Sequence, residues 1–130
     1  MQPGIVQAIQ SFEEEGKILF SQVDDSTCVL IPVESGSTIL VQDLEDFLCV
    51  RTGVDIRVAL DPEEDGIVDL LVEVLGSLRS GKATERFQVL YRSRIAPAGY
   101  TIEYPSGKMQ EMGDRQGREF SVRLPEWNAE

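Results

Sequence analysis

The chain has 130 residues and a formal net charge of −11, from 23 acidic and 12 basic side chains. It contains no histidine, the side chain that most often transfers protons near neutral pH and activates serine or cysteine nucleophiles. The composition therefore excludes triad hydrolases and histidine-ligated metal sites. The length fits one domain over residues 1–130. No run reaches the roughly 18 apolar residues of a membrane span, and the N-terminus lacks a signal-peptide layout, so we expect a cytoplasmic protein.

The charge is unevenly distributed along the chain. Residues 1–77 hold 16 acidic against 3 basic side chains, a net charge of −13, whereas residues 78–130 hold 7 acidic against 9 basic, a net charge of +2. An acidic surface repels nucleic acid and anionic membranes and attracts basic proteins. The first part of the chain therefore favours a basic protein partner.

The first predicted helix spans residues 3–15, with Pro3 at its start and Gly16 beyond its end. Three acidic residues crowd its last turn, against the helix dipole. They are Glu13, Glu14 and Glu15. Such a run is either a solvated face or the edge of an interaction surface.

Strands are predicted at 18–23 and 27–33, on either side of an Asp-Asp-Ser turn. Pro32 cannot donate to a sheet ladder, which indicates a free edge near the end of the second strand and is compatible with a homodimer.

The next segment is ambiguous. We expect a third strand at 38–42 and then a helix over 43–51, although one helix over 37–51 competes with this interpretation. Alternating apolar residues predict a half-buried strand at 54–60.

A central, largely buried helix is predicted over residues 61–81, capped by Asp61 and Glu64 and ended by Gly81. Its apolar face is wider than an ordinary amphipathic stripe, so we expect it to be covered on more than one side. Its remaining side carries an acidic ridge whose residues are spaced one helical turn apart. The ridge is formed by Asp65, Asp69 and Glu73 and continued by Ser77.

After this helix, strands are predicted at 86–94, 100–104, 108–112 and 118–124, forming a C-terminal β-meander. We expect an inner face that includes Phe120, Val122 and Leu124. The outer face is an alternative contact surface formed by Arg86, Arg92 and Arg94, or a lattice of Arg–Glu pairs. Residues 125–130 are expected to be a short tail.

The predicted elements indicate an α+β fold in which antiparallel sheets pack on the central helix. Asp61, Glu63, Asp65 and Gly66 match the opening of a calcium-binding EF-hand loop, but Val72 stands where a bidentate glutamate is required. Cys28 and Cys49 have no metal-binding spacing, and phosphate-binding glycine motifs are missing. We therefore expect neither a metal nor a cofactor.

The leading functional hypothesis is a non-enzymatic interaction module of inhibitor, immunity or adaptor type. It would bind a basic protein through Asp65, Asp69 and Glu73, with Glu13, Glu14 and Glu15 as a second acidic patch. The alternative is a small-molecule-binding regulatory domain, whose pocket lies between the central helix and the C-terminal strands near Tyr91, Tyr100 and Tyr104.

Overall fold

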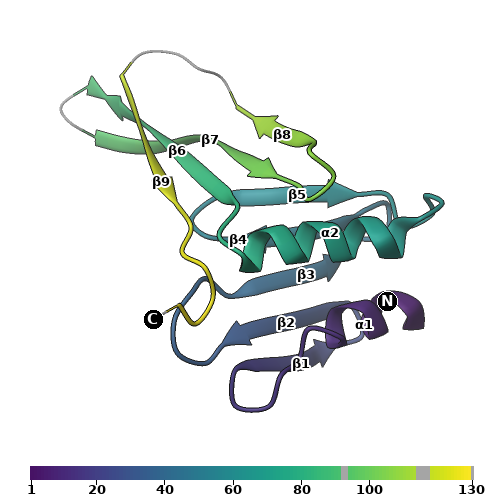
Figure 1. Ribbon diagram of the computed structural model, residues 1–130. Coiled ribbons are helices and arrows are strands. Elements are labelled where there is room, and N and C mark those ends of the chain that lie inside the picture. Colours follow the sequence, from purple (N-terminus) through teal and green to yellow (C-terminus); the bar gives the residue numbers. More distant parts are fainter. Residues whose placement is uncertain (92–93, 114–117, 130) are drawn as a thin grey trace.

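The computed structural model describes residues 1–91, 94–113 and 118–129 (Figure 1). Over these residues the chain is α+β, with two antiparallel sheets and two helices. The elements are α1 (Pro3–Gln10), β1 (Ile18–Asp24), β2 (Thr27–Pro32), β3 (Ile39–Asp43), β4 (Leu48–Thr52), β5 (Ile56–Leu60), α2 (Ile67–Arg79), β6 (Ala83–Leu90), β7 (Arg94–Glu103), β8 (Met109–Met112) and β9 (Glu119–Arg123).

The first five strands form a meander in the order β1-β2-β3-β4-β5, and both helices lie on one of its faces (Figure 1). Alternating residues of each strand point toward the helices, because successive side chains of a strand point to opposite faces. On β5 these are Ile56, Val58 and Leu60, all buried, as the alternation predicts. The helices supply Ile5, Ile9, Leu71, Val74, Leu75 and Leu78 to the same core.

The remaining strands form a second sheet in the order β8-β7-β6-β9. Strands β6 to β8 are joined by consecutive hairpins, and β9 then pairs with β6 at the other edge. This order is a Greek key, so the prediction of a simple C-terminal meander is wrong. The second sheet contacts the first through Tyr100, whose hydroxyl donates to the Arg57 carbonyl of β5 at 2.7 Å.

A buried carboxylate also ties the two sheets together. Glu85 of β6 accepts hydrogen bonds from the backbone N–H groups of Val54 and Asp55, at 2.9 to 3.2 Å, in the turn between β4 and β5. The side chain is almost fully buried. One carboxylate therefore satisfies the donors of a turn in the other sheet.

The predicted helix at 43–51 is wrong, and so is its longer alternative at 37–51. The predicted strand before it is confirmed as β3, which turns through residues 44–47 into β4. Asp43 Oδ1 accepts the N–H of Glu45 at 3.0 Å, and Glu45 has a positive φ of 72°. A side chain that bonds its own backbone two residues on favours a turn over a helix.

Helix α2 begins at Ile67, later than predicted. Asp61 does not cap the helix, because its Oδ1 accepts the N–H of Glu63 at 2.9 Å within a preceding turn. Gly66 then has a φ of 79°, the left-handed conformation that glycine adopts at low cost. Val68 and Val72 are exposed on α2, so the helix is buried on one side, and the prediction that it is covered on more than one side is wrong.

Two further boundaries differ from expectation. Helix α1 ends at Gln10 instead of residue 15. Residues 126–129 of the expected short tail are tied to the rest of the fold, because Trp127 is buried and its Nε1 donates to the Ser37 carbonyl at 2.9 Å. Within the described residues, neither helix is long and apolar enough to cross a membrane.

Candidate functional site

The predicted acidic ridge on α2 is broken up in the structure. Asp65 precedes the helix, in the turn before Gly66, while Asp69 is exposed on the first turn of α2. Glu73 is half-buried and accepts the N–H of Ser106 at 3.2 Å. Ser77 is buried. Only the start of the ridge therefore faces solvent freely.

The second predicted patch, Glu13 to Glu15, lies at the opposite end of α2. Glu14 pairs with Arg79, in the last turn of α2, with 3.6 Å between Nη1 and Oε1. Glu13 and Glu15 are exposed beside the start of β1. The two predicted patches thus lie near opposite ends of a 13-residue helix, about 20 Å long, and do not form one surface.

Arg86 does not contribute to the predicted arginine surface on the second sheet. Arg86 is only 5% exposed, and its Nη2 donates a hydrogen bond to the carbonyl of Met112 at the end of β8. Its Nη1 lies 3.9 Å from Glu119 Oε2, which agrees with the alternative of an Arg–Glu pair. Arg94 is exposed. Arg92 lies outside the described residues.

Phe120 and Val122 also differ from expectation. They share a face with Phe87 of β6, and the Phe87 and Phe120 rings stack at 5.5 Å. Both Phe120 and Val122 are more than 40% exposed, whereas Leu124 is buried as predicted. The core covers only the part of this face nearest the first sheet.

The structure gathers acidic side chains that are distant in sequence at one end of the first sheet. Because neighbouring strands are antiparallel, β1, β3 and β5 run in the same direction, and the segment that follows each of them lies at the same end. We define the acidic end as the carboxylates of these segments: Asp24, Asp25, Asp43, Glu45, Asp46, Asp61, Glu63, Glu64 and Asp65. All are exposed except Asp43, which is half-buried.

Strand register brings the three segments into contact with one another. Asp43 donates its N–H to the Ser26 carbonyl at 2.8 Å, which joins the turn after β3 to the turn after β1. Leu48 pairs with both Asp43 and Leu60, so the turn before β4 lies next to the segment that begins at Asp61. The nine carboxylates therefore belong to one continuous rim of the sheet.

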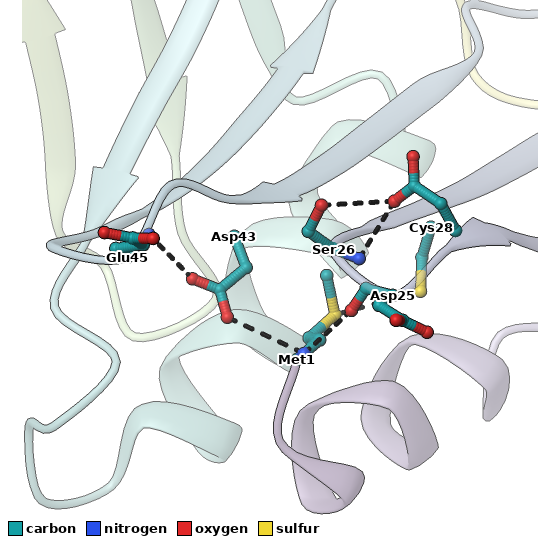
Figure 2. A network of polar contacts seen from close by, with 7 residues as sticks. Met1, Asp25, Ser26, Cys28, Asp43 and Glu45 are labelled. Atoms are coloured by element: carbon teal, nitrogen blue, oxygen red, sulfur yellow. Dashed lines mark hydrogen bonds and ion pairs between the residues drawn. The ribbon is translucent and has the colours of Figure 1, made fainter.

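The N-terminal ammonium is the positive group at this rim (Figure 2). Met1 N donates to the Asp25 carbonyl at 2.8 Å and lies 3.8 Å from Asp43 Oδ2. The Met1 side chain is buried, and its sulfur lies 3.8 Å from the sulfur of Cys28. The chain terminus is thus anchored under the rim.

Three of the carboxylates have a structural role in their turns. Asp24, Asp43 and Asp61 each accept the backbone N–H of the residue two positions on, at 2.9 to 3.0 Å. At Asp24 the hydrogen bond from Ser26 favours the ionised carboxylate and is the main reason why the pKa of Asp24 lies below its ordinary value.

The other carboxylates are not explained by turn formation. The described residues show no Lys or Arg ion pair at Asp25, Glu45, Asp46, Glu63, Glu64 or Asp65. Like charges close together repel, so this arrangement lowers the stability of the free protein unless a cation covers it.

An apolar hollow adjoins the acidic end on the outer face of the sheet. Leu44 is 47% exposed and Phe47 is 40% exposed, although both are large and apolar. With Cys49, Ala59 and the polar side chains of Gln42, Arg51 and Arg57, they line a depression of about 260 Å³. Exposed apolar side chains beside a charged rim are typical of a protein contact surface.

A second cavity, of about 280 Å³, lies between α2 and the end of β7. Ser77 is 1% exposed, and its hydroxyl has no hydrogen-bond partner among the described residues. Tyr104 lines the same cavity and donates to Gln110 Oε1, and burial raises its pKa to about 12. Tyr100 points instead to Arg57, and Tyr91 is exposed, so one of the three tyrosines predicted for this pocket lines it.

Among the described residues no group of three or more His, Cys, Asp or Glu side chains is arranged to hold a metal ion. Cys28 and Cys49 are free and buried, and burial raises the pKa of the Cys28 thiol, which keeps it protonated.

The sequence shows the acidic bias, but it does not show that carboxylates from three separate segments gather at the acidic end. The signal for the acidic end was that each of its three segments starts with an aspartate at or just after the end of a strand. That signal was hidden at Asp43 and Asp61, because predicted helices begin at these two residues. Comparison with protein-family models, curated proteins and solved structures found no match to the chain.

Proposed function

We propose that this protein is a non-enzymatic binding module that engages a basic site on a partner protein through its acidic end. The observation that carries the proposal is the unpaired carboxylates gathered at one rim of the first sheet. Charge complementarity would accelerate encounter with a basic partner and disfavour acidic ones. Binding through the acidic end would also cover the basic site of the partner, which is how an inhibitor or immunity protein acts.

The apolar hollow supports the same proposal. Charges at the periphery of a protein interface mostly set the association rate, whereas a few desolvated apolar side chains at its centre supply most of the affinity. Leu44 and Phe47 stand beside Glu45 and Asp46 in one turn, so one partner surface can contact both kinds of group. We expect the partner to present an apolar side chain next to Lys or Arg.

Affinity capture from the native lysate, at low and at high salt, tests this function. The bait would be the wild type, a rim variant and a matched control. The rim variant carries Glu45→Gln, Asp46→Asn and Glu63→Gln, and the control carries Glu34→Gln, Glu103→Gln and Glu126→Gln, which removes the same charge from exposed sites elsewhere.

We expect the wild type and the control to retain a basic protein at low salt and to release it at high salt. The rim variant should retain much less of it. Equal retention by all three baits would reject the acidic end as the contact surface.

The cavity between α2 and β7 favours a second candidate function, binding of a small polar molecule. A buried hydroxyl without a partner costs free energy, and a ligand atom that accepts its proton would recover that cost. A thermal-shift screen with nucleotides and metabolites tests this candidate, since a ligand that binds only the folded state raises the melting temperature. A hit whose shift disappears in Ser77→Ala would support the cavity, and an unchanged shift would place the ligand elsewhere.

A further inference from the structure

Strand β1 is an edge of the five-stranded sheet and pairs only with β2 among the described strands. The direction of its backbone groups follows from one hydrogen bond. Val33 donates to the Lys17 carbonyl at 2.9 Å, so residues 17 and 33 form a hydrogen-bonded pair. Since such pairs alternate along an antiparallel ladder, Leu19 and Ser21 also bond to β2. The backbone groups of Ile18, Phe20 and Gln22 therefore point away from the sheet.

This free edge has defined limits. The outward groups of Ile18 are already used, because its N–H donates to the Glu14 carbonyl at 2.9 Å and its carbonyl accepts from Glu14 at 3.1 Å. At the other end the register shifts between Gln22 and Asp24, which indicates a bulge. The backbone N–H and C=O groups of Phe20 and Gln22 remain available to an added strand.

Charges distinguish the possible occupants of this edge. Strand β1 itself has no charged side chain before Asp24. Lys17 directly precedes it, and the acidic groups on its two sides outnumber this single base. Glu13 and Glu15 lie at its start, next to Leu19 in a depression of about 360 Å³. Asp24 and Asp25 lie at its end and belong to the acidic end.

A second copy of this chain fits the edge poorly. Antiparallel pairing of two β1 strands about Phe20 and Gln22 would bring Asp24 of one copy to Ile18 of the other, whose outward backbone groups Glu14 already occupies, and Asp25 opposite Lys17. The acidic side chains around Glu14 would repel Asp24, and only Asp25 would gain an opposite charge. An extended segment with a cation on each side of an apolar centre would instead place a positive charge near the acidic groups at both ends of β1, so the interactions would be attractive.

The geometry points to β1 as the acceptor of an extended, basic segment of the partner, which is added to the sheet as a sixth strand. Main-chain hydrogen bonds to Phe20 and Gln22 would provide affinity, and Glu13, Glu15, Asp24 and Asp25 would select Lys or Arg at the two ends of the segment. This inference rests on the proposed function and specifies the partner as a basic strand.

The test uses a capped synthetic peptide of alternating valine and threonine with paired lysines at each end. Two variants of the full chain are compared with the wild type. Gln22→Pro removes the outward N–H at a position where an edge strand tolerates proline, and Gln22→Ala keeps that N–H as the matched control. We expect Gln22→Pro to weaken peptide binding by about tenfold and Gln22→Ala to leave it unchanged.

Amide hydrogen exchange of the wild type provides a readout that does not depend on a variant folding. The peptide should slow exchange at Phe20 and Gln22. No protection there, with or without peptide binding elsewhere, would overturn the inference. Protection that rises with protein concentration in the absence of peptide would overturn it in favour of a second copy.

The two proposals fail separately. If the peptide protects amides of the acidic end but not Phe20 and Gln22, the added strand is wrong and the acidic binding surface stands. If the rim variant described above captures the partner as well as the wild type does, the proposed function itself is wrong.

Discussion

At the scale of single residues, one buried carboxylate holds the two sheets in register with each other. Glu85 satisfies backbone donors of the turn that contains Gly53, and its Oε1 lies too close to the position that a β-carbon on Gly53 would take for any side chain to fit there. Glu85→Ala leaves these donors without a partner, so we expect it to lower the free energy of unfolding by about 1.5–3 kcal/mol. Chemical denaturation measures this loss, and Glu103→Ala, at an exposed glutamate, is the control. Equal stability of the two variants would contradict the role of Glu85.

Tyr104 makes the stability depend on alkaline pH. Burial raises its pKa from 10.0 to about 12, so the folded state disfavours the phenolate while the unfolded chain does not. Its contribution is fully present below pH 10 and is lost as the pH rises from about 10 toward 12. Unfolding free energies measured across this range should fall more steeply for the wild type than for Tyr104→Phe. Identical slopes would indicate that the phenol is not buried in solution.

At the scale of elements, the turn between β3 and β4 carries a conformational cost. Glu45 has a φ of 72°, a left-handed conformation that costs a residue with a β-carbon roughly 1–2 kcal/mol. Glu45→Gly should therefore raise the free energy of unfolding by up to about 1 kcal/mol, the gain being reduced by the greater flexibility of glycine in the unfolded chain. Glu45→Gln keeps the β-carbon and separates the charge effect from the backbone effect. A loss of stability in Glu45→Gly would contradict this account of the turn.

Two neighbouring segments show where sequence patterns predict the structure and where they do not. Strict alternation over residues 56–60 has one interpretation, and β5 forms there. Leu44, Phe47 and Leu48 have helical spacing, yet Leu44 and Phe47 are exposed and only Leu48 enters the core. Over so short a segment, the spacing of three apolar residues cannot distinguish a helix from a turn followed by a strand.

Long-range pairing was beyond the reach of local patterns. The alternation of residues 118–124 predicts a strand, but the pairing of β9 with β6 instead of β8 depends on residues more than 30 positions apart. The same limit applies to the candidate site. The acidic end is assembled by strand register, which brings Asp24, Asp43 and Asp61 to one rim, and a linear sequence shows only three separate acidic segments.

At the scale of the whole molecule, the uneven charge predicts an unusual response to salt. The acidic end repels itself, and the described residues contain few ion pairs that salt would weaken. Screening at about 0.15 M salt reduces repulsion beyond roughly 8 Å. We expect the melting temperature to rise by a few degrees between low and moderate salt, and to rise less in the rim variant than in the control variant. A fall in the wild type would show that attractive pairs dominate.

In the proposed function, the acidic end is the surface through which this protein binds a basic partner. The most direct measurement is amide hydrogen exchange of the chain, alone and in complex with the protein captured at low salt. We predict that the partner slows exchange in residues 24–26, 43–47 and 61–66. Protection confined to the second sheet or to the cavity beside Ser77, with the acidic end unchanged, would contradict the claim.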